Sequence, residues 1–279
     1  FVTFSFFREY SIERILRRKK VVEHFLALPV WAQALAATLF TYLMTAAGAS
    51  LVFFTKRGGK KFLTAASGLA AGIMIAASFF SLLLPALEQA GASGRASAAL
   101  VLTVGFLAGG AFIMLSDVLL SRMAVFKGRN KGGALMCAAM TLHNIPEGFA
   151  VGVAFGSLAG AQGALISAVM LAVGIGIQNF PEGLCVAMPL RRGGMRAGRA
   201  FFVGQASGFA EVPAGVLGAL AVGFVSALLP WALAFSAGAM IAVVCSELIP
   251  ESFSENKFLA SLGVVAGFTL MMFLDIFLG

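Results

Sequence analysis

Two short segments of nearly identical sequence carry the side chains of this chain that are best suited to chemistry. The first, HNIPEG, occupies residues 143–148, and the second, QNFPEG, occupies residues 178–183. Each places a possible metal ligand, His143 or Gln178, four residues before a glutamate, so that both groups lie on one face of a helix about one turn apart. Both segments lie inside long apolar stretches, where a membrane disfavours such groups unless they serve a function. The pair therefore predicts two halves of one metal site.

Acidic residues without basic partners support this prediction. Four carboxylates lie well inside apolar stretches, Glu247 lies nearer to an end, and no Lys or Arg lies at comparable depth. The four are Asp117, Glu147, Glu182 and Glu211. Unpaired buried carboxylates are strongly disfavoured, so several near one another need an external cation, either protons or a metal. His143 alone would be read as a packing residue, but with Glu147 one turn away it favours a cation site.

The repeated proline also favours this interpretation. A proline has no N–H to donate to the carbonyl group four residues earlier, so Pro146 and Pro181 free the carbonyl oxygens of Leu142 and Ile177. Each freed oxygen can bind a metal or water, and the helix can bend there. Proline and glycine are common in membrane helices, but the repeat of Asn-x-Pro-Glu-Gly makes chance unlikely to explain both copies.

The types of ligand restrict the metal. One imidazole, several carboxylates and amide oxygens, without a thiolate, suit Zn²⁺ and also Fe²⁺, Mn²⁺, Co²⁺ or Cd²⁺. Cu⁺ would favour sulfur, and an all-oxygen Mg²⁺ or Ca²⁺ site would have little use for His143. Cys137, Cys185 and Cys245 are dispersed and form no CxxC pair, so we interpret them as small packing residues.

The composition predicts a membrane protein. Of the 279 residues, 60% are hydrophobic and only 11% are charged, whereas a soluble domain is about half apolar and a quarter charged. Apolar stretches of about 20 residues, each long enough to span a bilayer, recur along the chain. They lie near 30–54, 63–87, 97–119, 133–156, 161–190, 199–224, 229–250 and 257–278. We therefore expect an all-α membrane protein with eight transmembrane helices, and one transporter domain over residues 30–279.

The net charge of +8 indicates topology rather than nucleic-acid binding, because the basic residues lie outside or at the edges of the apolar stretches. The loops near 55–62, 120–132 and 191–199 hold twelve Lys and Arg, and the three intervening loops hold only Arg95. Positive loops face the cytoplasm, so eight spans place both termini outside.

The first 29 residues form a separate N-terminal segment. Residues 1–24 mix basic and bulky apolar side chains, which predicts an interfacial amphipathic helix, with an extra transmembrane helix as the alternative. Its basic residues alone would favour a cytoplasmic N-terminus. The three basic loops later in the chain all indicate the opposite orientation, and we give them more weight. It has no clean apolar core before a small-residue cleavage site and so does not resemble a signal peptide.

Internal repeats predict the arrangement of the spans. AGIMIA at 71–76 in the second span resembles AGAMIA at 237–242 in the seventh, and each is followed by a proline and a glutamate. An Ala-Gly pair followed by an aspartate recurs in the third and eighth spans, at Asp117 and Asp275. With eight spans, the two members of each pair cross the membrane in opposite directions, and so do the two spans that carry the motifs. The pattern is a 3+2+3 inverted repeat, which is typical of transporters with a site near the midplane.

The motifs HNxPEG and QNxPEG resemble those of the ZIP (Zrt-, Irt-like protein) family of divalent-metal transporters, and the prokaryotic members most closely. The resemblance runs from near residue 30 to the end and includes eight spans with outward termini. It implies a primary metal site of His143, Glu147, Gln178 and Glu182. It also implies a second, adjacent site in which the two glutamates bridge to Asn144, Asn179 and Glu211. Met74 matches a thioether ligand, and Ser81, Asp117 and Glu247 match residues that line or gate the path.

Two departures from the family pattern concern the sites. Many members have His at the position of Gln178, and bacterial relatives can have Asp at that of Asn179. Neutral Asn179 leaves the second site one charge short, so we expect one firmly held ion and a weaker second one. Residues 120–132 are short and lack His, so a metal-sensing loop of the kind found in many members is not expected.

The resulting hypothesis is a secondary transporter, not an enzyme, in the inner membrane of a prokaryote. It would carry Zn²⁺, and also Cd²⁺, Fe²⁺ or Mn²⁺, into the cytoplasm by alternating access. The metal is the substrate, and no catalytic cofactor is expected. The expected partners are metal ions and the lipid bilayer, without nucleic acid, and a homodimer is left open. An intramembrane metallohydrolase is the first alternative, although the second His of HExxH is lacking. A metal-selective channel is the other.

Overall fold

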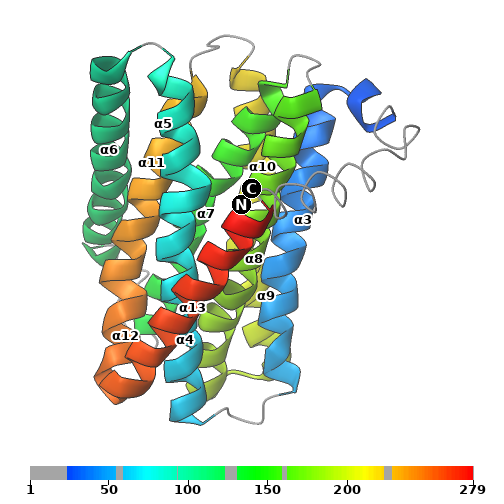
Figure 1. Cartoon of the computed structure of the whole chain (residues 1–279). Coiled ribbons are helices and arrows are strands. Elements are labelled where there is room, and N and C mark those ends of the chain that lie inside the picture. Colours follow the sequence, from blue (N-terminus) through cyan, green and yellow to red (C-terminus); the bar gives the residue numbers. More distant parts are fainter. Residues whose placement is uncertain are drawn as a thin grey trace.

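The computed structural model describes residues 24–54, 59–92, 94–122, 131–158, 162–222 and 228–278. All regular secondary structure within these ranges is helical, and the long helices run side by side as a bundle (Figure 1). The principal helices are α3 (Val30–Ser50), α4 (Lys60–Ala77), α5 (Leu84–Gly91), α6 (Arg95–Arg122), α7 (Lys131–Gly156), α8 (Gln162–Arg192), α9 (Ala197–Gly208), α10 (Glu211–Ala221), α11 (Leu228–Val243), α12 (Ile249–Glu255) and α13 (Lys257–Leu278). The N-terminal segment to residue 23 lies outside the described ranges.

Six helical stretches in the described part of the chain are long and apolar enough to cross a membrane. They are Val30–Phe53, Lys60–Gly91, Arg95–Leu120, Leu165–Arg192, Leu228–Glu255 and Lys257–Phe277. Two of the eight expected spans are therefore not among them. The span expected at 133–156 is the single helix α7, and the one expected at 199–224 is divided between α9 and α10.

The division between α9 and α10 has a local cause. Pro213 lies in the first turn of α10, and without an N–H it cannot donate to the carbonyl group of Phe209. The chain tightens there instead, since Val212 N donates to Phe209 O at 3.2 Å and Phe209 N donates to Ala206 O at 3.2 Å. As a result α10 begins at Glu211, one of the expected site residues.

Two π-helical segments interrupt the helices that continue from α4 and α11. The segment η2 (Ser78–Leu83) lies between α4 and α5, and η4 (Val244–Leu248) lies between α11 and α12. Each precedes a helix with proline in its first two positions, Pro85 or Pro250. The missing proline N–H weakens the regular ladder of hydrogen bonds, which accounts for a wider turn at this point.

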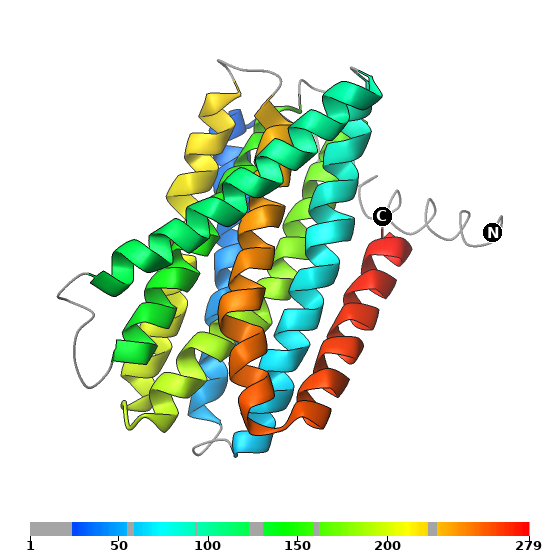
Figure 2. The same ribbon diagram turned by 90° about the vertical axis from the view of Figure 1, so that its left-hand side faces the viewer.

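The helices pack in four extensive pairs. They are α4 with α13, α6 with α11, α3 with α8, and α7 with α10. The most apolar windows of α6 and α13 are only 28% and 22% buried, so these two helices lie at the periphery, whereas that of α8 is 72% buried. Figure 2 shows α6 crossing obliquely over the outer side of the bundle. The central position of α8, next to α7, brings the two motifs together inside the protein.

Candidate metal centre

The two motifs lie on α7 and α8, and their glycines allow neighbouring helices to approach closely. A Cβ added to Gly148 would lie 2.3 Å from the carbonyl oxygen of Glu211 in α10. A Cβ added to Gly183 would lie 2.0 Å from the carbonyl oxygen of Thr45 in α3. Any larger residue would push the backbone of α10 or α3 away. The glycines therefore determine how near α10 and α3 come to the polar side chains.

Four side chains from the motifs meet in the buried interior. The Nε2 atom of His143 lies 3.1 Å from Glu147 Oε1 and 3.7 Å from Glu182 Oε1. One ligand atom from each of these three residues lies within 4.8 Å of the other two. The side-chain amide of Gln178 donates a hydrogen bond to Glu147 Oε1. All four side chains are buried, and we call His143, Glu147, Gln178 and Glu182 the primary cluster.

Many polar atoms of the primary cluster form no hydrogen bond within the described part of the chain. They are both ring nitrogens of His143, Oε2 of Glu147, Oε1 of Gln178 and both carboxylate oxygens of Glu182. Buried polar atoms are nearly always satisfied, and each one that is not costs about 1–3 kcal/mol. Here they converge on one place and include an imidazole and carboxylates. A divalent cation satisfies such a set of atoms directly.

A second polar group adjoins the first on the side of α3 and α10. Glu211 accepts hydrogen bonds at both carboxylate oxygens, from Asn179 Nδ2 at 2.7 Å and from the Thr41 hydroxyl group. The same Asn179 amide donates to the carbonyl oxygen of Thr41 at 3.2 Å. Glu147 and Glu182 both interact electrostatically with Glu211, and with each other, so the two groups are adjacent.

Asn144 of α7 is expected to belong to the same second site. Its side-chain amide donates to the carbonyl oxygen of Ser207 at 3.0 Å, and its Oδ1 has no hydrogen-bond partner. The Oδ1 atom of Asn179 is likewise without one. The orientation of both amides therefore leaves an acceptor oxygen free, as a cation ligand requires. We call the residues expected at the second site, Asn144, Asn179 and Glu211 with the bridging Glu147 and Glu182, the secondary cluster.

Sequence reasoning missed Thr41, which holds the Glu211 carboxylate. A signal for it exists, because Thr38, Thr41 and Thr45 recur at helical spacing in an apolar stretch and all three are buried. Threonines at this spacing share one helix face. Ser236 of α11 was also missed; its hydroxyl group donates to the carbonyl oxygen of Pro146 at 2.6 Å.

The remaining predicted residues lie elsewhere in the bundle. Met74 is fully buried in α4 among apolar side chains, and its role as a ligand stays a prediction. Ser81 in η2 donates to Asp275 Oδ1 of α13 at 2.7 Å. Asp117 of α6 and Glu247 of η4 are near enough to interact electrostatically. Each pair lies between a π-helical segment and a peripheral helix, but only Ser81 and Asp275 are hydrogen-bonded.

Comparison with known proteins identifies the family. The family model described as ZIP Zinc transporter matches residues 117–275, more than half of the chain, and this range contains both motifs and Glu211. The chain belongs to the ZIP family.

Curated relatives of this ZIP-family chain come from animals and bacteria. The human "Zinc transporter ZIP11" is 39% identical, over 88% of this chain and 97% of the relative. The "Zinc transporter GufA" of Myxococcus xanthus is 39% identical, over 88% of this chain and 98% of the relative. The "Zinc transporter ZIPB" of Bordetella bronchiseptica is 39% identical, over 85% of this chain and 79% of the relative. Family membership and the six apolar helices together make the chain an integral membrane protein.

Proposed function

We propose that this ZIP-family protein transports divalent transition-metal ions, Zn²⁺ foremost, across the membrane into the cytoplasm. The observation that carries the proposal is the primary cluster, in which imidazole and carboxylate atoms converge in the buried interior without hydrogen-bond partners. The names of the relatives, all zinc transporters, support zinc as the substrate and a role other than catalysis. The metal is cargo, so its ligands must bind it and also release it.

The primary cluster would hold the first ion and the secondary cluster a weaker second one. Glu147 and Glu182 would bridge the two positions, with Glu211 completing the second. Two dications a few ångströms apart repel strongly in a site of low dielectric constant, so the carboxylate charge nearby controls double occupancy. Asn179 contributes an oxygen without charge, which is why the second ion is held less firmly. Met74 is the proposed thioether ligand from α4.

We further propose that the chain is an eight-span 3+2+3 inverted repeat. The packing pairs support this, because α4–α13 and α6–α11 exchange under that symmetry, as do α3–α8 and α7–α10. The π-helical segments before Pro85 and Pro250 also exchange under this symmetry. The repeated Ala-Gly pairs also lie at equivalent contacts: a Cβ on Gly72 would meet Val264 O at 2.0 Å, and one on Gly238 would meet Phe106 O at 1.9 Å. α7 and α8 are then the central pair.

Alternating access would move one helix group against the other. The group of α3, α7, α8 and α10 carries nearly all of the site, whereas α4, α6, α11 and α13 form two closely packed pairs. Ser81 with Asp275, and Glu247 with Asp117, would line or gate the path at the π-helical segments of the second group. The protein would lie in the inner membrane of a prokaryote with both termini outside.

Alanine substitution of His143 and Glu182 tests the proposed function. Each change removes a ligand of the primary cluster, so we expect metal uptake into proteoliposomes to fall by at least about tenfold, as for residues that support metal ligands. His24→Ala, the only other histidine, and Glu255→Ala, at the exposed end of α12, are matched controls that retain uptake. Normal uptake by folded, reconstituted His143→Ala and Glu182→Ala proteins would refute the assignment. Failure to take up any of Zn²⁺, Cd²⁺, Fe²⁺ or Mn²⁺ by the parent protein would refute the function.

A further inference from the structure

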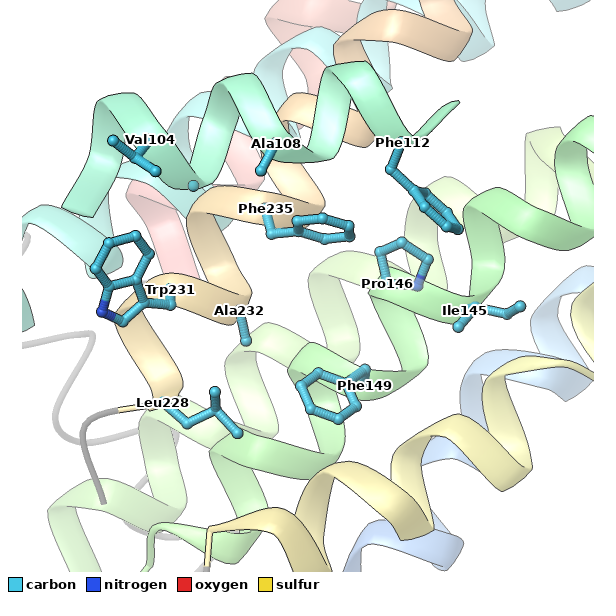
Figure 3. A pocket seen from close by; sticks show the side chains of 11 residues that line it. Val104, Ala108, Phe112, Ile145, Pro146, Phe149, Leu228, Trp231, Ala232 and Phe235 are labelled. Carbon is cyan, nitrogen blue, oxygen red and sulfur yellow. The ribbon is translucent and has the colours of Figure 1, made fainter. Parts of the chain in front are cut away.

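An apolar groove of about 400 Å³ lies where α6, α11 and α7 meet (Figure 3). Val104, Ala108 and Phe112 line it from α6, and their four-residue spacing places them on one face of that helix. Side chains of α11, among them Trp231 and Phe235, form the opposite wall. The indole N–H of Trp231 is the one polar side-chain group among the residues that line the groove, so the groove offers a polar ligand almost no partner.

The floor of the groove is the helix that carries the candidate metal site. Pro146 and its neighbours Ile145 and Phe149 close it on the side of α7 (Figure 3). Pro146 stands between Asn144 and Glu147, two residues of the clusters. Ser236 of α11 donates to the Pro146 carbonyl oxygen, so α7 and α11 are joined directly beneath the groove. A molecule in the groove would therefore pack against the outer side of the site.

The rim of the groove carries a tryptophan near a helix end. Trp231 is the fourth residue of α11, and its side chain is 36% exposed. Trp31, the other tryptophan of the chain, is the second residue of α3 and is 45% exposed. Both helices begin at the upper end of the bundle in Figure 1, so the two rings lie at the same end of the bundle. Tryptophan concentrates at the membrane–water interface, which places this rim near the lipid headgroups.

We propose that the groove binds one acyl chain of a bilayer phospholipid. The headgroup would stand at the level of Trp231, and the chain would run inward between α6 and α11 to Ile145 and Phe149. The groove opens on helices that face the membrane, since Val104 and Ile145 are both exposed, so hydrocarbon is the medium that reaches it. Lipid chains match walls that are almost entirely apolar, and burying apolar surface there also fills a junction between three helices.

Tryptophan quenching by brominated lipid tests this binding. The Trp31→Phe protein reports on Trp231 alone, and the Trp231→Phe protein reports on Trp31, an exposed ring at the same end of the bundle. In bilayers that contain phosphatidylcholine brominated on its acyl chains, Trp231 should be quenched at several-fold lower mole fractions of that lipid than Trp31. Equal quenching curves for the two rings would overturn the proposal.

A groove-filling variant makes the test specific. Ala108→Phe, in the Trp31→Phe background, should shift the quenching curve of Trp231 to the one that Trp31 gives in the Trp231→Phe protein. Ala111→Phe adds the same ring to an exposed position of α6 outside the groove and should leave the curve unchanged. The smaller Ala108→Leu provides the same readout if the phenylalanine variant does not fold. An unchanged curve for both folded Ala108 variants would overturn the proposal. Quenching of Trp231 that decreases as protein is concentrated in the bilayer would do so too, because another protein copy would then cover the groove.

The effect on transport rests on the proposed function and is measured separately. Because the chain packs against α7 beside Pro146, we expect Ala108→Phe to lower metal uptake severalfold relative to Ala111→Phe, with metal binding in detergent unchanged. Equal uptake by the two variants would overturn the coupling to transport and leave the quenching result to decide the binding. Failure of the proposed function itself is distinguishable, since it would remove uptake from the parent protein without altering quenching.

Discussion

At the scale of single residues, the secondary cluster is defined by the hydrogen bonds that hold one carboxylate. Glu211 accepts from Asn179 and from Thr41, and Asn179 keeps its Oδ1 free. The amide of Asn179 therefore stabilises the negative charge of Glu211 without adding charge of its own. We therefore expect occupancy by a second ion to depend on whether Asn179 or a carboxylate stands beside Glu211.

Changing Asn179 or Glu211 should alter the second ion and spare the first. Asn179→Asp adds a negative charge beside Glu211 and removes the donated hydrogen bond, so we expect tighter binding of the second cation. Glu211→Gln removes a charge and should weaken it. Calorimetric titration and anomalous diffraction of the parent and both variants measure the stoichiometry. Two equally tight ions in the parent, unaffected by either change, would contradict the charge argument.

Thr41 should influence the second ion through Glu211. Thr41→Val keeps the shape of the side chain and removes the hydroxyl group that donates to the carboxylate. With that donor gone, the Glu211 carboxylate is held less firmly, and we expect second-ion affinity to fall by about a factor of ten, the size of one hydrogen bond to a charged group. Metal titration is again the measurement.

Thr38→Val is the matched control for Thr41→Val. The Thr38 hydroxyl group donates at 2.8 Å to the carbonyl oxygen of Ala34 in its own helix, so its removal leaves Glu211 untouched. If both valine variants changed second-ion affinity equally, the effect would belong to α3 as a whole and not to the contact with Glu211.

At the scale of helices, close contacts at glycine set the positions of the elements around the site. Gly148 and Gly183 meet the backbones of α10 and α3, which carry Glu211 and Thr41. The π-helical segments η2 and η4 interrupt the helices that continue from α4 and α11, which pack against α8 and α7. The site is thus assembled from helices that are close because they lack side chains at their contacts.

Gly183→Ala should separate α8 from α3. The new methyl carbon would lie 2.0 Å from the Thr45 carbonyl oxygen, so the helices must move apart, and such overpacking costs about 1–3 kcal/mol. We expect a lower Tm of the detergent-solubilised protein and weaker metal binding. Gly198→Ala, in α9 with no atom within 4 Å of the new carbon, should leave both unchanged. A Gly183→Ala protein as stable as Gly198→Ala would show that this contact does not constrain the packing.

At the scale of the whole molecule, the distribution of charge predicts how the protein lies in the membrane. Twelve basic residues lie in or at the edges of the loops near 55–62, 120–132 and 191–199, which we expect to face the cytoplasm. Parts of these loops, at 55–58 and 123–130, lie outside the described residues. The prediction therefore depends on the charge pattern and needs a direct test.

Cysteine labelling in a cysteine-free background tests the topology. Gly59→Cys, whose Cβ would meet no atom within 4 Å, should react with a membrane-impermeant thiol reagent only after the cells are permeabilised. Ala92→Cys, at the exposed turn that follows α5, should react in intact cells. The opposite pattern would reverse the orientation and, with it, the expected direction of transport. Equal labelling of both would indicate leaky cells, and labelling of a cytoplasmic marker protein in the same cells checks for this.

The membrane class and the candidate ligands of this protein follow from its sequence alone. Apolar stretches without strong polar faces require helices in a membrane, and the two repeated motifs bring one imidazole and two glutamates to neighbouring helices. The primary cluster could be predicted because its members lie one turn apart within each motif, which is a local property of the chain. The break between α9 and α10 before Glu211 also has a local cause, Pro213. It was not predicted, because the residues around Pro213 form one continuous apolar stretch.

The surroundings of those residues follow only from the folded arrangement of the helices. Thr41 contacts Glu211 across 170 positions of the chain, and Ser236 contacts Pro146 across 90. Such contacts depend on which helices pack together. In helices apolar on every side, hydrophobic periodicity cannot indicate this, because lipid and protein interior are alike to an apolar side chain. The packing follows instead from close approach at glycines and from the fit of side chains between helices. The same fit leaves the groove between α6, α11 and α7, which no single segment of the sequence encodes.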